Sequence, residues 1–308
     1  MIGVFTKQRA APALAAAMLA ASVLVAAAQE QEQRLERLTG TLAKVDRSRA
    51  ITLGYREASF PFSYAGPGGE PMGYSIDLCR AIVEEIGREI DKPDIKINYV
   101  AVTSETRIGA VVSGKVDLEC GSTTSNAERQ KQVAFSPIMF VTGTKLMVKR
   151  GSPIKSYRDL KGKVVVVTAG TTNEQAMKRL NEKFQLGANV ISARDHEESY
   201  RLLVDGKADA FATDDILLYG LIAHHNMQRE LTVVGDFLSY DPYGIMFRKD
   251  DPQLNAAVVR TFQQLAESRD LILNYDKWFV RKTPTGERIN LPIGPQLEEV
   301  FRVLGLTD

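Results

Sequence analysis

The sequence has few of the residues that hold metals or carry redox chemistry: two cysteines and three histidines among 308 residues. Cys79 and Cys120 form no CxxC pair and have no histidine cluster near them, so neither a zinc site nor a redox motif has a basis in the sequence. His224 and His225 are adjacent inside a predicted helix, and no nucleophile elbow or metal motif accompanies them. We therefore expect no metal and no cofactor.

An excess of charge of either sign is also missing. The 39 Lys and Arg residues nearly balance the 38 Asp and Glu residues, which leaves a formal net charge of +1, and no long basic run occurs. Binding to nucleic acid through its phosphates therefore has little support, and any charged ligand must be held by a local group of charges. With 44% hydrophobic residues, the chain can bury one large core or two smaller ones with a cleft between them.

Long apolar runs are absent after the first 28 residues. Lys7 and Arg9 precede an almost uncharged run of Ala, Leu and Val over residues 10–28, and polar residues follow from Gln29. This pattern predicts a secretory signal peptide over residues 1–28 and release as an exported protein. The alternative is a retained anchor helix, because the run approaches the roughly 20 residues that span a bilayer.

Strands and helices alternate through the rest of the chain. A polar stretch at residues 29–45 has weak helical spacing and is expected to form a short N-terminal arm or helix. A strand is expected over residues 51–55, then a helix that starts near Tyr74 with Ser75 as its N-cap. Residues 95–100 alternate apolar and polar side chains, which is typical of a strand with one wet face. This order predicts an α/β fold.

A weak internal repeat indicates two similar lobes. Residues 108–118 and 202–210 each contain an apolar helix end, the pattern Gly-Lys-x-Asp and the start of a strand. The two strands lead into polar residues at 121–124 and 213–215, as expected where strand ends line a ligand crevice. A chance similarity of two helix–turn–strand segments is the alternative.

A further polar turn follows the Val-rich strand at residues 163–167. Gly170, Thr171 and Thr172 connect this strand to a helix that ends near Phe184. Helix N-termini present free N–H groups and about half a positive charge, so this turn is a candidate site for a carboxylate or a phosphate. The glycine spacing and the lysine of a phosphate loop are missing.

Longer motifs extend over nearly all of the chain that follows the signal peptide. They include Gly54-Tyr55-Arg56-Glu57, Thr103-Ser104 with Arg107-Ile108, Glu119-Cys120-Gly121-Ser122-Thr123-Thr124, Glu128-Arg129-Gln130-Lys131, Gly170-Thr171-Thr172, Ser192-Ala193-Arg194-Asp195-His196, Asp214-Asp215, Tyr243-Gly244 and Trp278-Phe279. In these motifs the sequence resembles the periplasmic glutamate/aspartate-binding proteins of bacterial ABC amino-acid importers, which are family 3 extracellular solute-binding proteins. The Gly-Ser-Thr-Thr run with Glu-Arg-Gln-Lys is the most specific part of this resemblance.

The resemblance implies the type II periplasmic-binding-protein fold, an α/β fold of two lobes with the ligand in the cleft between them. The chain is expected to cross between the lobes near residues 141–145 and 239–243. The first lobe then holds residues 46–142 and 243–308, and the second lobe holds residues 143–242. Two crossings permit hinge closure around a ligand.

The resemblance also implies a set of ligand-binding residues for two carboxylates and one ammonium group. The nine residues are Arg129, Thr124 and Thr172 for the α-carboxylate, Asp214 and Ser122 for the ammonium group, and Arg56, Ser104, Arg107 and His196 for the side-chain carboxylate. Arginine suits both carboxylate positions because a guanidinium group binds a carboxylate through two parallel hydrogen bonds.

Some of these residues also fit structural roles. A lone arginine is usually a solvated surface residue, and a Ser or Thr after a strand usually forms a cap or a turn. Asp214 or Asp215 could equally cap the helix predicted at residues 216–223. His196 could be a turn residue between two acidic neighbours.

Two other pairs of residues have open interpretations. Phe62 and Tyr64 either cover the methylene groups of a ligand or pack within their own loop. Cys79 and Cys120 either form a disulfide, which an exported protein permits, or are two free buried thiols.

The function implied by the resemblance is binding of L-glutamate or L-aspartate in the periplasm and delivery to an ABC transporter permease with its ATPase. We expect a monomer with no catalytic activity and no nucleic-acid partner. The alternatives are a periplasmic enzyme of the same fold, such as a dehydratase or a hydrolase, and a binder of a related polar amino acid such as glutamine. The sequence does not rank glutamate against aspartate, because the two differ by one methylene group.

Overall fold

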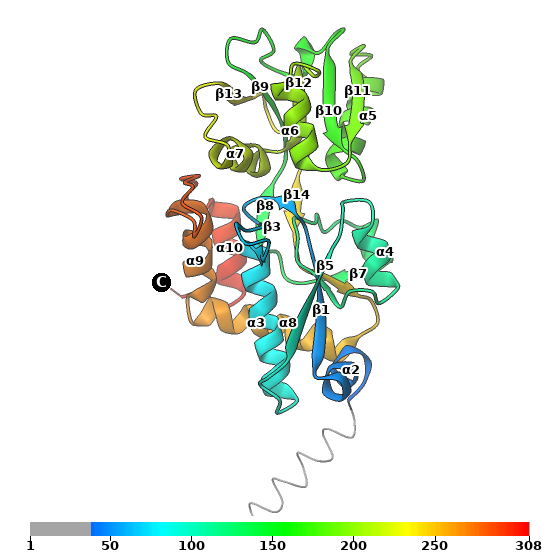
Figure 1. The fold of residues 1–308 in the computed structure, drawn as a ribbon, viewed down its shortest axis with the longest axis vertical. Helices are drawn as coiled ribbons and strands as arrows, with labels where there is room; N and C mark the ends of the chain where they lie inside the picture. The colour runs from blue at the N-terminus through cyan, green and yellow to red at the C-terminus, as the bar shows by residue number, and fades with distance from the viewer. Residues whose placement is uncertain (1–37, 308) are drawn as a thin grey trace, which may run out of the picture.

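The computed structural model describes residues 38–307, which form two lobes stacked along the long axis of the molecule (Figure 1). Each lobe is built on its own five-stranded sheet. The predicted signal peptide, residues 1–28, and residues 29–37 of the predicted arm lie outside the described residues.

The sheet of the first lobe has the strand order β5-β1-β6-β15-β7. Its strands are β1 (Ala50–Tyr55), β5 (Lys96–Ala101), β6 (Leu118–Glu119), β7 (Val133–Phe135) and β15 (Met246–Arg248). β1 runs parallel to β5 and β6, whereas β15 runs antiparallel to β6 and β7. The strands predicted at residues 51–55 and 95–100 are thereby confirmed, with end points that differ by one residue.

The sheet of the second lobe repeats this arrangement with the order β11-β10-β12-β9-β13. Its strands are β9 (Thr144–Lys149), β10 (Val164–Thr168), β11 (Asn189–Ala193), β12 (Ala210–Asp214) and β13 (Leu231–Val234). β10 runs parallel to β11 and β12, and β9 runs antiparallel to β12 and β13.

The predicted internal repeat is confirmed, because its two copies lead into β6 and β12, which hold the same central place in their sheets. The glycines of the two Gly-Lys-x-Asp patterns also adopt the same backbone conformation. Gly114 has a φ of 73° and Gly206 a φ of 75°. Glycine reaches this left-handed region without steric cost, which explains its use at both turns.

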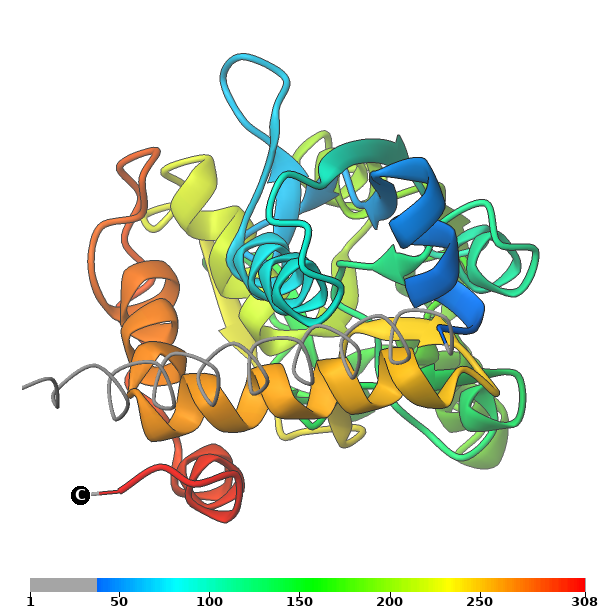
Figure 2. The ribbon, with the colours of Figure 1, turned by 90° about the horizontal axis from the view of Figure 1, so that it is seen from below.

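Helices pack on both faces of the first sheet. α3 (Tyr74–Glu89) and α8 (Pro252–Glu267) pack against each other on one face, where they cross at a large angle (Figure 2), and α4 (Arg107–Val112) covers the other. Met246 and Phe247, adjacent in β15, belong to different core clusters because successive side chains of a strand point to opposite faces.

The second sheet is covered in the same way. Val165 and Val167 of β10 pack with α5 (Thr172–Lys183), whereas Val166 packs with α6 (His196–Val204) and α7 (Asp215–His224). The bare Val-rich strand is therefore buried on both faces, as its sequence predicts.

The described part of the predicted N-terminal arm packs on the first lobe. Leu42 and Val45 of α2 (Gly40–Ser48) are fully buried, and the backbone N–H of Thr41 donates a hydrogen bond to Asp251, at the start of α8 (2.8 Å). The first lobe is completed by α9 (Asp270–Tyr275), a π-helix (Asp276–Val280), α10 (Pro295–Val303) and a small sheet of β2 (Ala58–Ser59), β3 (Ser63–Ala65) and β4 (Pro71–Met72).

The chain passes between the lobes through two paired strands. β8 (Phe140–Thr142) and β14 (Asp241–Tyr243) run antiparallel between the two large sheets (Figure 1). The first leads from the first sheet to the second, and the other leads back. They lie close to the crossings predicted at residues 141–145 and 239–243; the domain boundaries themselves stay a prediction.

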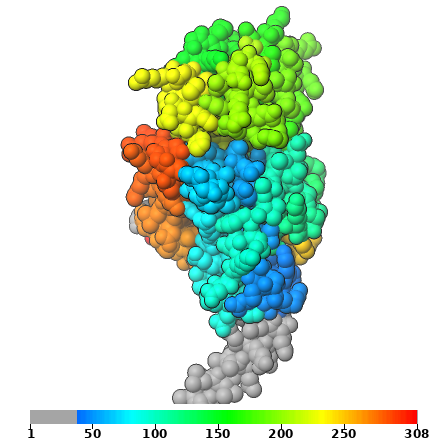
Figure 3. Space-filling view, in the orientation of Figure 1, coloured from blue at the N-terminus to red at the C-terminus, as the bar shows by residue number. Residues whose placement is uncertain are grey.

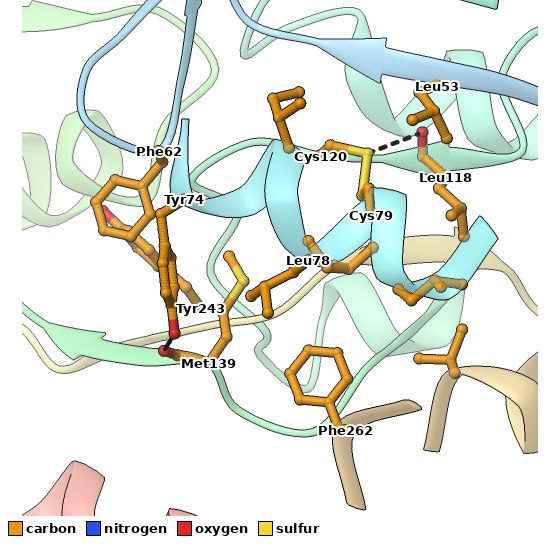
Figure 4. Packing of buried hydrophobic residues seen from close by; sticks show 14 of the residues in the cluster. Leu53, Phe62, Tyr74, Leu78, Cys79, Leu118, Cys120, Met139, Tyr243 and Phe262 are labelled. Atoms are coloured by element: carbon orange, nitrogen blue, oxygen red, sulfur yellow. Dashed lines mark hydrogen bonds between the residues drawn. A yellow bond between two sulfur atoms is a disulfide. The ribbon is translucent and has the colours of Figure 1, made fainter. Parts of the chain in front are cut away.

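A disulfide ties α3 to the end of β6 within the first core. Cys79 and Cys120 are bonded, with their Cα atoms 6.2 Å apart, a separation that suits a disulfide (Figure 4). Phe62 is fully buried near the same helix and contacts Tyr74 and Tyr243. Phe62 therefore packs in the core against residues outside its own loop, which differs from both interpretations of this residue.

The N-cap predicted for α3 is wrong. Gly73, not Ser75, precedes the first helical residue, and the hydroxyl of Ser75 donates a hydrogen bond to the carbonyl oxygen of Gly121 (2.8 Å). A Cβ at Gly73 would lie 2.2 Å from the carbonyl oxygen of Phe62, so only glycine fits where these two segments meet. This close approach comes from tertiary packing, which a local capping pattern does not reveal.

The two lobes are in direct contact, and Figure 3 shows their surfaces touching on the side that faces the viewer. A Cβ at Gly170 in the second lobe would lie 2.8 Å from the Cα of Glu105 in the first. A Cβ at Gly220 of α7 would lie 2.6 Å from the carbonyl oxygen of Phe60 in the first lobe. Both glycines therefore permit the close approach of the lobes.

Candidate functional site

A narrow cavity lies where the two lobes meet. The first lobe contributes Ser104, Arg107, Ser122 and Thr124, and the second contributes Thr171, Thr172, Asn173, His196, Asp214 and Leu217. Seven of the nine predicted binding residues are in this lining. Arg56 and Arg129 are not, although both are buried in the first lobe.

Strand ends bring the lining residues together. In the first lobe, Arg107 lies in α4 after β5, and Ser122 lies just past β6. In the second lobe, Thr172 begins α5 after β10, His196 begins α6 after β11, and Asp214 ends β12. Ligands of open α/β sheets bind outside the carboxyl ends of their strands, and here two such edges face each other.

Arg107 is the arginine of the cavity wall, and its side chain is only partly paired. One Nη atom donates hydrogen bonds to Oγ1 of Thr123 (2.7 Å) and to the carbonyl oxygen of Ser122 (3.3 Å). Its Nε atom is buried and has no partner among the described residues. Burial lowers the pKa of this guanidinium group. A buried donor without a partner is costly, so a ligand acceptor there would be bound favourably.

Arg56 lies behind the cavity wall. Its side chain is 2% exposed and packs against the backbone of Gly121, and one Nη atom has no partner among the described residues. Burial, followed by the neighbouring charge of Arg107, lowers the pKa of Arg56 to about 10. The group thus stays charged at neutral pH.

Arg129 holds the backbone next to the cavity. It begins the 3₁₀ turn Arg129–Lys131 and donates a hydrogen bond to the carbonyl oxygen of Thr124 (3.0 Å). Burial, then the charge of Arg107, lowers its pKa to about 9. Arg129 is therefore charged at neutral pH and positions Thr124, a residue of the cavity lining.

His196 is a buried neutral imidazole and not a turn residue in solvent. It is the first residue of α6, whose N-cap is Asp195, and its Nδ1 lies 2.8 Å from Oγ1 of Thr168. Burial and the charges of Arg56 and Arg107 hold its pKa well below the usual value. A neutral imidazole can still donate one hydrogen bond into the cavity.

Asp214 is the one carboxylate in the cavity lining. It accepts hydrogen bonds from Nδ2 of Asn173 (2.8 Å) and from the hydroxyl of Tyr243, and its side chain does not cap α7. Burial and the nearby charge of Asp241 raise the pKa of Asp214 to about 8. The raised pKa reflects burial without an ion-pair partner among the described residues, so Asp214 suits a ligand that brings a positive charge.

Hydroxyl groups complete the lining. The side-chain oxygens of Ser104 and Ser122 are buried and have no partner among the described residues. Oγ1 of Thr124 and Oγ1 of Thr172 lie 3.2 Å apart across the lobe junction. Thr171 caps α5, because its hydroxyl oxygen accepts a hydrogen bond from the N–H of Glu174 (3.1 Å). The prediction of a helix start at this turn is confirmed.

The arrangement combines cationic donors and hydroxyl groups with one carboxylate. It can therefore hold a small ligand that carries carboxylate groups and an ammonium group. Within residues 38–307, no group of three His, Cys, Asp or Glu side chains could hold a metal ion. No helix in that part of the chain is long and apolar enough to cross a membrane.

Sequence reasoning missed four residues of the site. Thr171, Asn173 and Leu217 line the cavity, and Tyr243 bonds to Asp214. Thr171 lies in the turn that is a candidate anion site, and Asn173 follows this turn in the first residues of α5. Tyr243 lies in one of the motifs that carry the resemblance, but the sequence gives it no role. Nothing in the local sequence marks Leu217.

Comparison with known proteins gives the family. The sequence profile of the bacterial extracellular solute-binding proteins, family 3, matches residues 51–281. The L-glutamate/L-aspartate-binding protein of Pseudomonas aeruginosa is 44% identical over 295 residues, which cover 95% of this chain and 96% of that protein. The glutamate/aspartate import solute-binding protein of Escherichia coli is 41% identical over 263 residues, which cover 85% of this chain and 87% of that protein.

A solved structure agrees with this result. An ancestral amino-acid-binding protein, a precursor of cyclohexadienyl dehydratase, superposes with a TM-score of 0.68 at 30% sequence identity, and the match covers 78% of this chain and 99% of that one. The two-lobe fold, the matched profile and the length of both sequence matches agree, and the chain belongs to family 3 of the bacterial extracellular solute-binding proteins.

Proposed function

We propose that this protein binds an acidic L-amino acid, glutamate or aspartate, in the cleft between its lobes. The observation that carries the proposal is the pair of buried arginines in and behind the cavity wall. Arg56 and Arg107 are each 2% exposed, and each keeps a guanidinium nitrogen without a partner among the described residues. Burying such cations is costly unless anions pair with them. A ligand with two carboxylates supplies those anions.

The α-amino acid group of the ligand is assigned to the second lobe and the junction. Thr124 and Thr172 offer hydroxyl groups from opposite sides, and Arg129 adds a positive charge for the α-carboxylate. Asp214, helped by the hydroxyl of Ser122, takes the ammonium group.

The side-chain carboxylate is assigned to the first lobe and the start of α6. Arg56 and Arg107 supply charge, and Ser104 and His196 supply hydrogen bonds. Because His196 is neutral, it adds a donor without adding a third charge at this end of the ligand.

We propose further that residues 1–28 are removed on export and that the protein works in the periplasm as a monomer. Residues 46–142 and 243–308 would form one lobe and residues 143–242 the other. The protein would pass its ligand to an ABC permease with its ATPase. The name of the Escherichia coli relative, an import solute-binding protein, supports this role.

Recovery of the native ligand tests the proposal. The mature protein is purified from the periplasm of its host without added amino acids, the bound ligand is released by denaturation and identified by mass spectrometry, and melting is measured with the twenty amino acids. We expect glutamate or aspartate, recovered unchanged, and the largest rise in Tm with these two. A larger rise with an amide or a basic amino acid would contradict the ligand assignment. Conversion of added ligand into a product would contradict the binding role and favour an enzyme.

A further inference from the structure

Glu119 is a carboxylate buried in the middle of the first sheet. It ends β6, which lies between β1 and β15, and its side chain is 0% exposed. Acidic side chains are almost never fully buried unless they are paired, because removing a charge from water is costly. The location therefore requires a compensating positive charge nearby.

One route from Glu119 leads to Arg107. The hydroxyl of Thr123 donates a hydrogen bond to Oε2 of Glu119 (2.5 Å), and the same hydroxyl oxygen accepts a hydrogen bond from Arg107 (2.7 Å). Thr123 is fully buried and does not line the cavity. Thr123 thus links an arginine of the cavity wall to a carboxylate that does not itself reach the cavity.

A second route leads to Arg56. A Cβ added to Gly121 would lie 2.3 Å from Oε1 of Glu119 and 2.9 Å from Cγ of Arg56, so both side chains pack against the same stretch of backbone. Oε1 of Glu119 has no hydrogen-bond partner among the described residues. The carboxylate therefore acts on Arg56 through its charge.

The electrostatic effect of Glu119 reaches all three arginines of the site. Of the carboxylates near them, Glu119 has the largest effect in raising the pKa of Arg56, of Arg107 and of Arg129. Asp195, Asp214 and Asp241 act more weakly on one or two of these arginines. Glu119 is thus the main internal counter-charge of the group.

We propose that Glu119 is a specificity-determining residue, whose negative charge limits how strongly the arginines of the cleft prefer a carboxylate side chain to an amide. The inference rests on the proposed function, because it requires the side-chain carboxylate of the ligand to lie near Arg56 and Arg107. The same charge lets three guanidinium groups be buried together before a ligand pairs with them. Removing it would make the unliganded protein less stable and the cleft more selective for anions.

Titration of Glu119→Gln with glutamate and with glutamine tests the proposal. Glutamine at this position keeps an oxygen that can accept the hydrogen bond from Thr123 but removes the charge. We expect the ratio of glutamate affinity to glutamine affinity to rise about tenfold, because the potential at a desolvated site responds strongly to one nearby charge. The rise in Tm on addition of glutamate should also exceed that of the wild type.

Two further variants separate charge from shape. Glu119→Asp keeps the charge, and its affinity ratio should stay within about threefold of the wild type. Asp117→Asn is the matched control, because Asp117 is also a buried carboxylate of the same segment but pairs with Lys44 (2.7 Å) away from the cavity. Its affinity ratio should not change.

An unchanged or lower ratio in Glu119→Gln would overturn the proposal. If Glu119→Gln does not fold, the test rests on Glu119→Asp. This variant keeps the charge, so a change of more than about tenfold in its ratio of glutamate affinity to glutamine affinity would overturn the proposal. The wild type is titrated first. If it binds neither glutamate nor aspartate, the proposed function fails, and the inference fails with it. If the wild type binds glutamate and the ratio does not respond to Glu119, only the inference fails.

Discussion

Oγ1 of Thr124 and Oγ1 of Thr172 lie 3.2 Å apart, although the two residues are separated by 48 positions and stand on different lobes. Thr124 follows β6 of the first sheet, and Thr172 begins α5 beside the second. The hydroxyl of Thr124 donates a hydrogen bond to Oδ1 of Asp241 (3.0 Å), and Thr124 and Thr172 both line the cavity, so a ligand in contact with both residues bridges the two lobes. Binding and lobe closure are therefore expected to be coupled, because a ligand shifts the equilibrium toward the form that offers it more contacts.

The contact between Gly220 and Phe60 gives a prediction about closure. A Cβ at Gly220 would lie 2.6 Å from the carbonyl oxygen of Phe60. This oxygen belongs to the backbone, so it cannot move aside as the end of a flexible side chain can. Gly220→Ala should therefore lower glutamate affinity by about tenfold or more, since overpacking typically costs about 1–3 kcal/mol. Titration, together with the radius of gyration from small-angle scattering at saturation, measures this effect.

The same substitution should not weaken the second lobe by itself. Alanine stabilises a helix interior by about 1 kcal/mol relative to glycine, so the unliganded protein should keep or raise its Tm. Gly109→Ala in α4 is the matched control, because nothing lies within 4 Å of a Cβ at that helical position. If Gly220→Ala has the glutamate affinity of the wild type and the same radius of gyration at saturation, ligand binding does not require the close approach of Gly220 to Phe60.

Arg107 and Arg129 are predicted to act at opposite ends of the ligand. Removing one charged partner from a buried pair typically costs about 2–5 kcal/mol, which is roughly thirtyfold to several thousandfold in affinity. Arg107→Met should therefore weaken glutamate strongly and glutamine less, whereas Arg129→Met should weaken both alike, since both carry an α-carboxylate. Calorimetric titration of both variants with both ligands provides the comparison. Equal losses of affinity for glutamate and glutamine in Arg107→Met would contradict the assignment of Arg107 to the side-chain carboxylate of the ligand.

Lysine should not restore either site fully. A lysine ammonium group is a point charge and lacks the planar fork of guanidinium. Arg107→Lys should therefore bind glutamate more tightly than Arg107→Met but more weakly than the wild type. Wild-type affinity in Arg107→Lys would show that charge alone is sufficient.

Glutamate affinity should depend on pH through Asp214. The pKa of this carboxyl group is raised to about 8, so near pH 7 it is largely protonated before binding. An ammonium group favours the ionised form, so binding should release a proton, and affinity should rise with pH and level off above about pH 8. Calorimetry at pH 7 in buffers with different ionisation enthalpies counts the protons released. Binding without proton release, or affinity that falls between pH 6 and 8, would contradict the role given to Asp214.

The disulfide should contribute to stability. Cys79 and Cys120 close a loop with a sequence separation of 41, for which the chain-entropy relation gives about 4 kcal/mol. The double variant Cys79→Ala, Cys120→Ala should lose about that much free energy of unfolding in urea. Thiol counting on the denatured, unreduced mature protein should find no thiol. Two titratable thiols would show that the cysteines are not bonded.

Features of the fold that depend on local sequence could be predicted well. The Val-rich β10 and the turn that starts α5 each depend on residues that are adjacent in the sequence. Thr171 likewise caps the helix that follows it directly. The Gly-Lys-x-Asp repeat also led to the right conclusion, because Gly114 and Gly206 meet the same backbone requirement.

Features that depend on distant segments could not be predicted in the same way. The N-cap of α3 was assigned to Ser75, because nothing nearby in sequence shows that Gly73 meets Phe62. The hydrogen bond of Tyr243 to Asp214 forms only when the chain has returned through β14. The sequence indicates no special role for Glu119, because only the fold places Arg56, Arg107 and Arg129 near this residue.

The most direct test of acidic amino-acid binding is calorimetric titration of the wild-type protein with glutamate, aspartate, glutamine and asparagine. If Arg56 and Arg107 pair with a side-chain carboxylate, glutamate or aspartate should bind at least about 100-fold more tightly than its own amide, a difference of about 2.7 kcal/mol. Amides that bind as tightly as the acids would contradict the account.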